Sequence, residues 1–295
     1  MEVEVSTLHA FSDKALGGNP AGVVLQAAHL SESQMQEVAR QVGFSETAFV
    51  MPSDQADFKV RFFTPSDEVD LCGHATIALF YLMKTQHLVD VGTYTLETLA
   101  GILKVVIAVN GEVYLSQTLP EFGEIVDRQQ IADSLRISME DLHSELPVQI
   151  VSTGLPDILI AVRDVDVLTK IDPDFQRITE ICKAHHAVGY HVFTLESDAE
   201  DVLAECRNFA PLYDIPEESA TGTSNGAMLC YLYKYNQLTD PHHHTYTIRQ
   251  GYTMNRPSEI RARLTLNSSN EITQIQVGGS AVHIKNIKMG LSHKS

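Results

Sequence analysis

One local pattern occurs twice along the chain, and it limits the folds that the sequence can adopt. A strand ends in Phe-x-Pro, an acidic loop follows, and a small residue, a glycine and a polar residue then open an apolar helix. The pattern runs from Phe63 to His74 in the first half and from Phe209 to Thr223 in the second. It indicates two similar halves with a ligand site at their seam, and the alternative is a chance similarity of two short stretches. The 295 residues suffice for two domains with separate cores.

Hydrophobic periodicity divides the first half into alternating strands and helices. Ser31 and Gln34 form a capping box that predicts a helix to about Gln41, and Gly73–Lys84 is an apolar helix. The expected strands cover residues 3–8, 21–25, 47–51 and 58–63, then two or three more within 94–115, which Gly101 and the hairpin signal Asn110-Gly111 interrupt.

The second half resumes this alternation after a polar, helical stretch at 119–146, which we take as the crossing between domains. Asp172-Pro173 opens a helix, and 222–235 is a second apolar helix. The expected strands are 148–152, 158–162, 192–195, 202–209 and a run of strands from Thr245 onward. We expect a first domain at 1–117, completed by a returning strand at about 278–295, and a second domain at 118–277.

Charge and composition limit the kinds of partner and cofactor that the chain is expected to bind. Against 21 basic residues stand 38 acidic ones, a formal net charge of −17, so the chain should repel nucleic acid. It contains no apolar run of about 20 residues and no signal peptide at its start, which predicts a cytoplasmic protein without a membrane segment. The four cysteines lack zinc-like spacing, and nucleotide and metalloprotease motifs are missing, so we expect neither a metal nor an organic cofactor.

Histidines outside the repeated pattern favour no ligand site. His185, His186 and His191 are assigned to a helix end and a turn, where histidine interacts well with the helix dipole. The run His242–His244 is assigned to a solvated loop.

The two glycine-bearing helix starts, Gly73-His74 and Gly222-Thr223, are candidate anion sites. A helix start offers free N–H groups and a positive dipole end, and glycine lets a ligand approach the backbone. Either glycine alone could simply begin a helix, but the occurrence of two favours carboxylate binding.

Glu46 is the candidate general acid/base, because it is a carboxylate among apolar neighbours in the stretch 43–50. Its local sequence also fits a solvated loop residue or a helix cap. His74 is either a proton donor or relay, or a helix cap or core histidine. Cys72 does not indicate a two-thiol epimerase, because the repeat places Thr221 at the matching position and a hydroxyl is no base at neutral pH.

Several motifs, in order from about residue 7 to 258, resemble the PhzF-like phenazine-biosynthesis isomerase family of the diaminopimelate epimerase-like superfamily. They are Asn19-Pro20, Ser45–Phe49, Arg61–Pro65, Glu68–Thr76 with its CGHAT stretch, Phe209–Pro211, Gln250-Gly251 and Arg256–Ser258. The resemblance implies an α+β fold of two similar domains with the diaminopimelate epimerase-like fold. Each would be a mixed, largely antiparallel sheet rolled around a central helix, at 73–84 and at 222–235.

The resemblance also implies an activity, a cofactor-independent isomerase that moves a proton within a small cyclic carboxylic acid at the interdomain cleft. The family reaction isomerises dihydro-3-hydroxyanthranilate, and its members are commonly homodimers. The implied catalytic residues are Glu46, His74 and Glu218, and the implied substrate-binding residues are Asn19, Gly73, Gly222 and Thr223.

One departure from the family pattern leaves other functions open. Where the family shows Glu-Asp-Pro, this chain has Glu217-Glu218-Ser219, so its carboxylate is one methylene longer and the proline is lost. A first alternative is an amino-acid racemase or epimerase that uses Glu46 with Glu218 as second base. A second is a non-catalytic protein that binds a small carboxylate.

Overall fold

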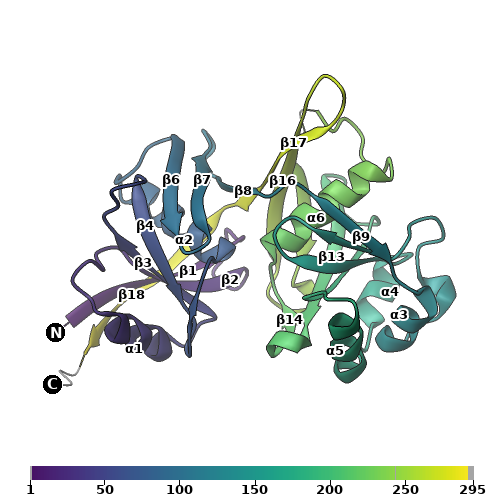
Figure 1. Cartoon of the computed structure of the whole chain (residues 1–295), viewed down its shortest axis with the longest axis horizontal. Helices are drawn as coiled ribbons and strands as arrows, with labels where there is room; N and C mark the ends of the chain where they lie inside the picture. The colour runs from purple at the N-terminus through teal and green to yellow at the C-terminus, as the bar shows by residue number, and fades with distance from the viewer. Residues whose placement is uncertain (1, 243, 292–295) are drawn as a thin grey trace. The chain divides into compact units, whose positions relative to one another are not determined.

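The computed structural model describes residues 2–242 and 244–291, and the chain divides into two compact units (Figure 1). The first unit contains the residues up to Ser116 and those from Gly278 onward, and the second runs from Gln117 to Val277. Within the described residues, no helix has both the length and the apolar character to span a bilayer. His243 of the histidine run lies outside the described residues.

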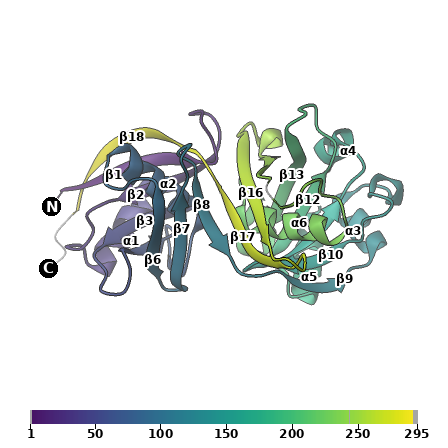
Figure 2. The ribbon, with the colours of Figure 1, turned by 90° about the horizontal axis from the view of Figure 1, so that it is seen from above.

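The first unit is a mixed sheet wrapped around one helix. Its strands are β1 (Glu2–Ala10), β2 (Asn19–Val24), β3 (Glu46–Met51), β4 (Phe58–Phe63), β5 (Glu68–Val69), β6 (Gly92–Thr98), β7 (Gly101–Ile107), β8 (Val113–Gln117) and β18 (Ala281–Gly290). The ladder runs β18–β1–β2–β3–β4–β6–β7–β8, and only the β2–β3 and β4–β6 pairs are parallel. The last strand of the chain, β18, lies along the first, β1 (Figure 2).

Two helices cover this sheet in different ways. The central helix α2 (Gly73–Thr85) is apolar nearly all round and contacts β1, β2, β3 and β18, so it is buried as a core helix. The helix α1 (Glu32–Val42) is amphipathic and packs Met35, Val38 and Ala39 against β3 and β4. The predicted capping box of Ser31 and Gln34 is confirmed at its start.

The second unit has the same plan. Its strands are β9 (Glu121–Ile125), β10 (Gln149–Ser152), β11 (Pro156–Ala161), β12 (Gly189–Thr194), β13 (Val202–Ala210), β14 (Ile215–Glu218), β15 (Tyr246–Gln250), β16 (Ser258–Leu266) and β17 (Ile272–Gly279). Its helices are α3 (Arg128–Leu135), α4 (Val165–Lys170), α5 (Phe175–Ala184) and the central α6 (Gly222–Lys234), with short 3₁₀ turns η1 (Met139–Asp141), η2 (Pro211–Tyr213) and η3 (Tyr252–Met254).

Strand pairing in the second unit repeats that of the first, step by step. The ladder runs β9–β10–β11–β12–β13–β15–β16, and of its pairs only the third and the fifth, β11–β12 and β13–β15, are parallel. The short strands β5 and β14 pair with β4 and β13, the strands that end in Phe-x-Pro in each unit. The expected fold of two similar units, each a mixed sheet rolled around a central helix, is therefore confirmed.

The repeat extends to register and to single ion pairs. Ala48 pairs with Phe62 between β3 and β4, and His191 pairs with Asn208 between β12 and β13, one residue before the phenylalanine of each Phe-x-Pro. Between parallel neighbours, Lys59 Nζ lies 2.6 Å from Glu97 Oε1. The matching positions in the second unit are Glu205 and Arg249, which pair at 3.3 Å with the signs exchanged.

Four local features of the second half differ from the predictions. The polar stretch at 119–146 contains the strand β9, whose five residues are all exposed and therefore show no apolar alternation. The helix α4 was not expected, and α5 begins at Phe175 with Asp174 as its N-cap rather than at Asp172-Pro173. His191 lies inside β12 and is fully buried, whereas the sequence had suggested a turn.

Candidate functional site

Glu46 and His74 meet at one end of the first unit. Glu46 is the first residue of β3, and His74 is the second residue of α2. Their closest atoms, Glu46 Oε2 and His74 Nε2, lie 3.4 Å apart, and the two side chains are 21% and 8% exposed. Glu46 Oε2 is buried and has no hydrogen-bond partner within the described residues. A carboxylate oxygen held out of water without a partner is rare unless the site has a function.

Polar neighbours orient the His74 ring. The amide nitrogen of Asn19, the first residue of β2, lies 3.4 Å from Nδ1, and Ser45 Oγ lies 3.4 Å from Nε2. With the Asn19 amide in this orientation, Nδ1 accepts a hydrogen bond, so a neutral ring carries its proton on Nε2, toward Glu46. The Cys72 thiol also lies 3.4 Å from Nδ1.

The start of α2 leaves its first amides available. Its N-cap, Cys72, makes no side-chain hydrogen bond to the helix, and Thr76 Oγ1 donates instead to the Cys72 carbonyl at 2.7 Å. A Cβ added to Gly73 would meet only Leu115, at 4.0 Å, so this glycine does not serve close packing. The first turn of α2 can therefore accept an anion beside Glu46 and His74.

The same corner of the first unit offers three metal-ligand atoms. Glu46, Cys72 and His74 each contribute one, and these atoms all lie within 4.8 Å of one another. Three mixed oxygen, sulfur and nitrogen donors match the number of protein ligands in catalytic zinc sites. The three residues could hold a soft divalent cation, although the sequence predicts that none is needed.

The candidate residues of the second unit gather at the start of α6. Glu218 is the last residue of β14, and its Oε2 accepts a hydrogen bond of 2.8 Å from Thr221 Oγ1. Thr221 is the N-cap, and it too gives the helix no side-chain hydrogen bond. Gly222 and Thr223 follow as the first two helical residues, in the positions that Gly73 and His74 occupy in α2.

Beneath this helix start lies a set of buried polar groups that the sequence analysis did not identify. They are Asp157, His191, Asn208, Ser224, Asn225 and Gln250. The available signal was a polar residue within an apolar strand, as at Asp157 and His191. Burial raises the pKa of Asp157 to about 7 and lowers the pKa of His191 to about 4.

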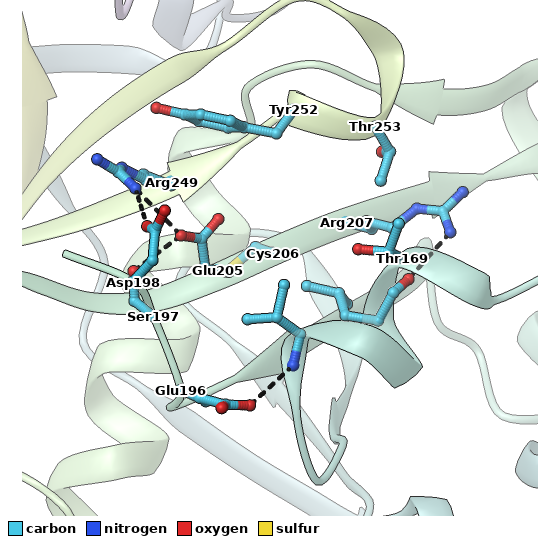
Figure 3. A pocket seen from close by; sticks show the side chains of 12 residues that line it. Thr169, Glu196, Ser197, Asp198, Glu205, Cys206, Arg207, Arg249, Tyr252 and Thr253 are labelled. Carbon is cyan, nitrogen blue, oxygen red and sulfur yellow. Dashed lines mark hydrogen bonds and ion pairs between the residues drawn. The ribbon is translucent and has the colours of Figure 1, made fainter.

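A separate cavity of about 360 Å³ lies in the second unit and holds none of the predicted site residues (Figure 3). Arg249 Nη1 pairs with Asp198 at 2.9 Å and with Glu205 at 3.3 Å, while its Nε is buried without a hydrogen-bond partner within the described residues. Arg207 pairs with Glu217 at 2.9 Å and donates to the Leu168 and Ile171 carbonyls. Of the lining carboxylates, Asp198 and Glu205 pair with Arg249, and Glu196 accepts a hydrogen bond from the Val165 amide, so none is an unpaired acid/base group comparable to Glu46.

These features define a class: a two-unit α+β protein of the diaminopimelate epimerase-like fold, with a glutamate and a histidine side by side at one helix start and a carboxylate at the other. The chain belongs to the phenazine biosynthesis-like protein family (PhzC-PhzF), whose model matches residues 8–286.

Individual relatives agree with this membership. The chain is 33% identical to the uncharacterised isomerase YfhB of Bacillus subtilis, over 96% of this chain and 97% of that protein. It is 26% identical to trans-2,3-dihydro-3-hydroxyanthranilate isomerase of Pseudomonas chlororaphis, over 93% and 95%. A crystal structure of a PhzF-family protein from Bacillus anthracis superposes with a TM-score of 0.90 at 31% identity, over 99% of this chain and 100% of that one.

The fold extends beyond the family. A crystal structure of a probable proline racemase from Agrobacterium radiobacter matches with a TM-score of 0.65 at 13% identity, over 98% of this chain and 93% of that one. This likeness concerns the fold alone.

Proposed function

We propose that this chain is a cofactor-independent isomerase in which Glu46 moves a proton within a small, cyclic carboxylic acid. Membership of the family and the isomerases among its relatives make it an enzyme of the isomerase class. The observation that carries the finer proposal is the buried, unpartnered Oε2 of Glu46 beside His74 Nε2. An acid/base group must reach the substrate directly. The Glu46 side chain is 21% exposed, which leaves it within reach of a substrate, and its Oε2 has no competing hydrogen-bond partner within the described residues.

The proposed step moves one proton from one carbon of the substrate to another. The carboxylate of Glu46 removes a proton from a carbon beside an electron-withdrawing group, the double bond moves, and the same carboxyl group returns the proton to another carbon. His74 donates from Nε2 to hold Glu46 or the substrate. The amides at the start of α2 bind the substrate carboxylate and stabilise the negative charge that develops.

The second unit has a supporting role in this proposal. The amides of Gly222 and Thr223 form a second anion-binding helix start, and Glu218 orients the substrate or relays protons. The hydrogen bond from Thr221 to Glu218 supports this assignment because it fixes the carboxylate in one orientation.

The substitution Glu46→Gln tests the proposal. It keeps the shape of the side chain and removes its proton transfer, so we expect at least a 100-fold loss of turnover, within the range that general acid/base catalysis contributes. The probe is trans-2,3-dihydro-3-hydroxyanthranilate in D₂O, with proton NMR following both rearrangement and deuterium uptake. Glu37→Gln, on the exposed face of α1, is the matched control. Normal turnover by Glu46→Gln would refute the assignment.

The same NMR experiment separates the alternatives. With amino acids as probes, a racemase incorporates deuterium at the α-carbon and inverts that centre, whereas an isomerase shifts a double bond. A binding protein would retain a small carboxylate without proton exchange over hours.

We also propose a homodimer, on the basis of the family resemblance. Sedimentation equilibrium should give twice the chain mass, and a concentration-independent monomer would contradict this proposal.

A further inference from the structure

Six polar side chains, each at most 3% exposed, lie in and around the first turns of α6. We refer to them as the buried polar layer. They are Asp157 from β11, His191 from β12, Asn208 from β13, Ser224 and Asn225 from α6, and Gln250 from β15. Each of the four strands supplies one residue, and the helix supplies two.

Hydrogen bonds connect one half of the layer from β11 to the helix. Ser224 Oγ donates to the Asp157 carboxyl group. Asn208 Nδ2 donates to Ser224 Oγ and to His191 Nδ1, both at 3.2 Å. Since Nδ1 accepts, the neutral His191 ring carries its proton on Nε2 and donates it to Asn225 Oδ1 at 3.2 Å.

The other half leads to Glu218. Asn225 Nδ2 donates to the Thr221 carbonyl at 2.8 Å and to Gln250 Oε1 at 2.9 Å. Gln250 Nε2 then donates to the Glu218 carbonyl at 2.8 Å and to Thr221 Oγ1 at 3.0 Å, and Thr221 Oγ1 donates to the Glu218 carboxylate. Both the backbone and the carboxylate of Glu218 are therefore held from one side by Gln250 and Thr221.

The backbone next to Glu218 is clamped as well. Gly251 has φ +80°, and a Cβ at this position would lie 2.6 Å from the Ser219 carbonyl oxygen. Only glycine allows β15 to approach the loop before α6 this closely.

The first unit shows that the fold itself does not require polar groups at four of these six positions. The register of its strands places Ala21, Ala48 and Phe62 at the positions of Asp157, His191 and Asn208, and Ala75 takes the place of Ser224. All four are fully buried. Buried polar networks are costly to satisfy, and apolar side chains fill these four positions in the repeat. The positions of Asn225 and Gln250 hold the buried threonines Thr76 and Thr98. The part of the layer formed by Asp157, His191, Asn208 and Ser224 is thus specific to the unit that carries Glu218.

The chemistry of the layer decides what it can do. The connection from Asp157 to Glu218 passes through the side-chain amides of Asn208, Asn225 and Gln250, and a neutral amide cannot accept a proton on one atom and release another at neutral pH. A proton wire is therefore excluded, and rigidity remains as the contribution of the layer.

We propose that the buried polar layer is a positioning network, which holds Glu218 and the amides of Gly222 and Thr223 in the geometry that the isomerisation uses. This inference rests on the proposed function of those three residues. Asn225 and Gln250 are its positioning residues. Gln250 holds the Glu218 backbone directly and its carboxylate through Thr221, and Asn225 acts through Gln250 and the Thr221 carbonyl.

The first test is independent of any substrate. In Gln250→Ala, amide hydrogen exchange of residues 215–226 should rise at least tenfold, while exchange elsewhere in the second unit stays as in the wild type. Tyr231→Phe is the matched control, because it removes one buried hydrogen bond, from Tyr231 to the Pro147 carbonyl, farther along α6. Unchanged exchange at 215–226 in a folded Gln250→Ala protein would overturn the inference, whether or not the chain is active.

Thr221 supplies a second pair of variants in case Gln250→Ala fails to fold. Thr221→Val removes the hydroxyl group that Gln250 and Glu218 share, and Thr221→Ser keeps it. We expect faster exchange at 215–226 in the first variant and wild-type exchange in the second. Equal behaviour of the two would count against the network.

The second test connects the layer to catalysis. With trans-2,3-dihydro-3-hydroxyanthranilate, kcat should fall at least tenfold in Gln250→Ala and in Thr221→Val, and should be unchanged in Thr221→Ser and Tyr231→Phe. Faster exchange with unchanged kcat would show a merely structural network and overturn the inference. If the wild type transforms none of the probes, the proposed function fails, and the exchange experiments alone decide whether the network holds Glu218.

Discussion

The pKa values of two side chains of the buried polar layer are shifted in opposite directions, and burial is the main cause of both shifts. Burial raises the pKa of Asp157 from 3.8 to about 7, although hydrogen bonds from Ser224 and the Gly189 backbone oppose this change. Burial also lowers the pKa of His191 from 6.5 to about 4. At pH 5–6, folding therefore leaves both groups uncharged, which is how a protein interior accommodates ionisable residues.

The opposite shifts predict how stability depends on pH. Between pH 4 and 7 the folded state holds the Asp157 proton and the unfolded state does not, so this group makes the free energy of unfolding fall as pH rises. Between pH 4 and 6.5 the unfolded state protonates His191 and the folded state does not, so this group makes it rise. In urea titrations, the free energy of unfolding of Asp157→Asn should rise by on the order of 2 kcal/mol between pH 4 and 6.5, because only the contribution of His191 remains. That of His191→Asn should fall between pH 4 and 7, because only the contribution of Asp157 remains.

The wild type should show a flatter profile than either variant, because the two contributions oppose each other. Asp172→Asn, at an exposed carboxylate, is the control. Parallel profiles for the wild type and both layer variants would contradict the burial argument.

The cluster of Glu46, Cys72 and His74 predicts a response to metal ions. Prolonged EDTA treatment should leave turnover unchanged, because the proposed proton shift uses no metal. Micromolar Zn²⁺ should inhibit by occupying the three donors, and Cys72→Ala should relieve this inhibition by at least tenfold in the inhibitory concentration. A loss of activity with EDTA that Zn²⁺ restores would reverse the prediction and make the cluster a resident metal site.

Single residues differ in how far the sequence can assign them. His74 directly follows Gly73, and both Glu46 and His74 lie within specific motifs, so local sequence singles them out, and the structure places them 3.4 Å apart. Their catalytic roles stay predictions. His191 could not be assigned, because its partners Asn208 and Asn225 come from another strand and from a helix, and no local pattern shows that a histidine will be satisfied there.

Among the elements, the parallel pair β11–β12 shows how one position differs between the repeats. Gly189 opens β12 at the register position where Glu46 opens β3. A Cβ at Gly189 would lie 2.3 Å from the Phe209 carbonyl oxygen of β13. The second unit can therefore carry no side chain where the first carries its candidate acid/base, and its carboxylate comes from β14 instead.

This close contact predicts the effect of one methyl group. Gly189→Ala should lower the free energy of unfolding by about 2 kcal/mol or more, because a backbone atom of β13 would have to move. Gly92→Ala is the control, since it also lies in a strand and its Cβ would meet only the Tyr94 ring, at 3.9 Å. The control should change by less than about 0.5 kcal/mol in denaturant unfolding. Equal stability of the two variants would show that β12 and β13 are free to separate.

Elements whose signals are local were predicted well. The Ser31 capping box, the hairpin at Asn110-Gly111 and both central helices are confirmed, because caps, turns and all-apolar runs depend on neighbouring residues. The strand β9 was missed because only its pairing with β10 makes it a strand, and its side chains are exposed on both faces.

At the scale of the whole molecule, the repeated pattern in the sequence reflects a repeated topology. It could be predicted because Phe-x-Pro and the glycine helix start recur within each half. The exchange of signs between Lys59–Glu97 and Glu205–Arg249 could not, because each pair joins strands that are distant along the chain.

The chain also closes on its own beginning, since β18 pairs with β1 from Glu2↔Gly290 to Ala10↔Ala281. A chain that ends at Val277 should lose the first unit as a stable structure, because β1 would expose an unpaired edge together with the core residues Val3 and Val5. Limited proteolysis should then cut within the first unit and spare the second. A chain that ends at Leu291 keeps every described strand pair and should resist cleavage. Equal resistance of both truncations would show that β18 is dispensable.

Because of this pairing, the first unit can be completed during translation only after the second unit. Strands β1 to β8 of the first unit leave the ribosome before the second unit, yet their sheet still lacks β18, which is encoded some 270 codons after β1. At synthesis rates of about 5–20 residues per second, β1 remains without that partner for roughly 15–50 s. In that interval the whole second unit emerges from the ribosome. The nascent chain then contains a complete second unit and a first unit that still lacks β18. The strands of the first unit are therefore the segment that a chaperone would have to shield.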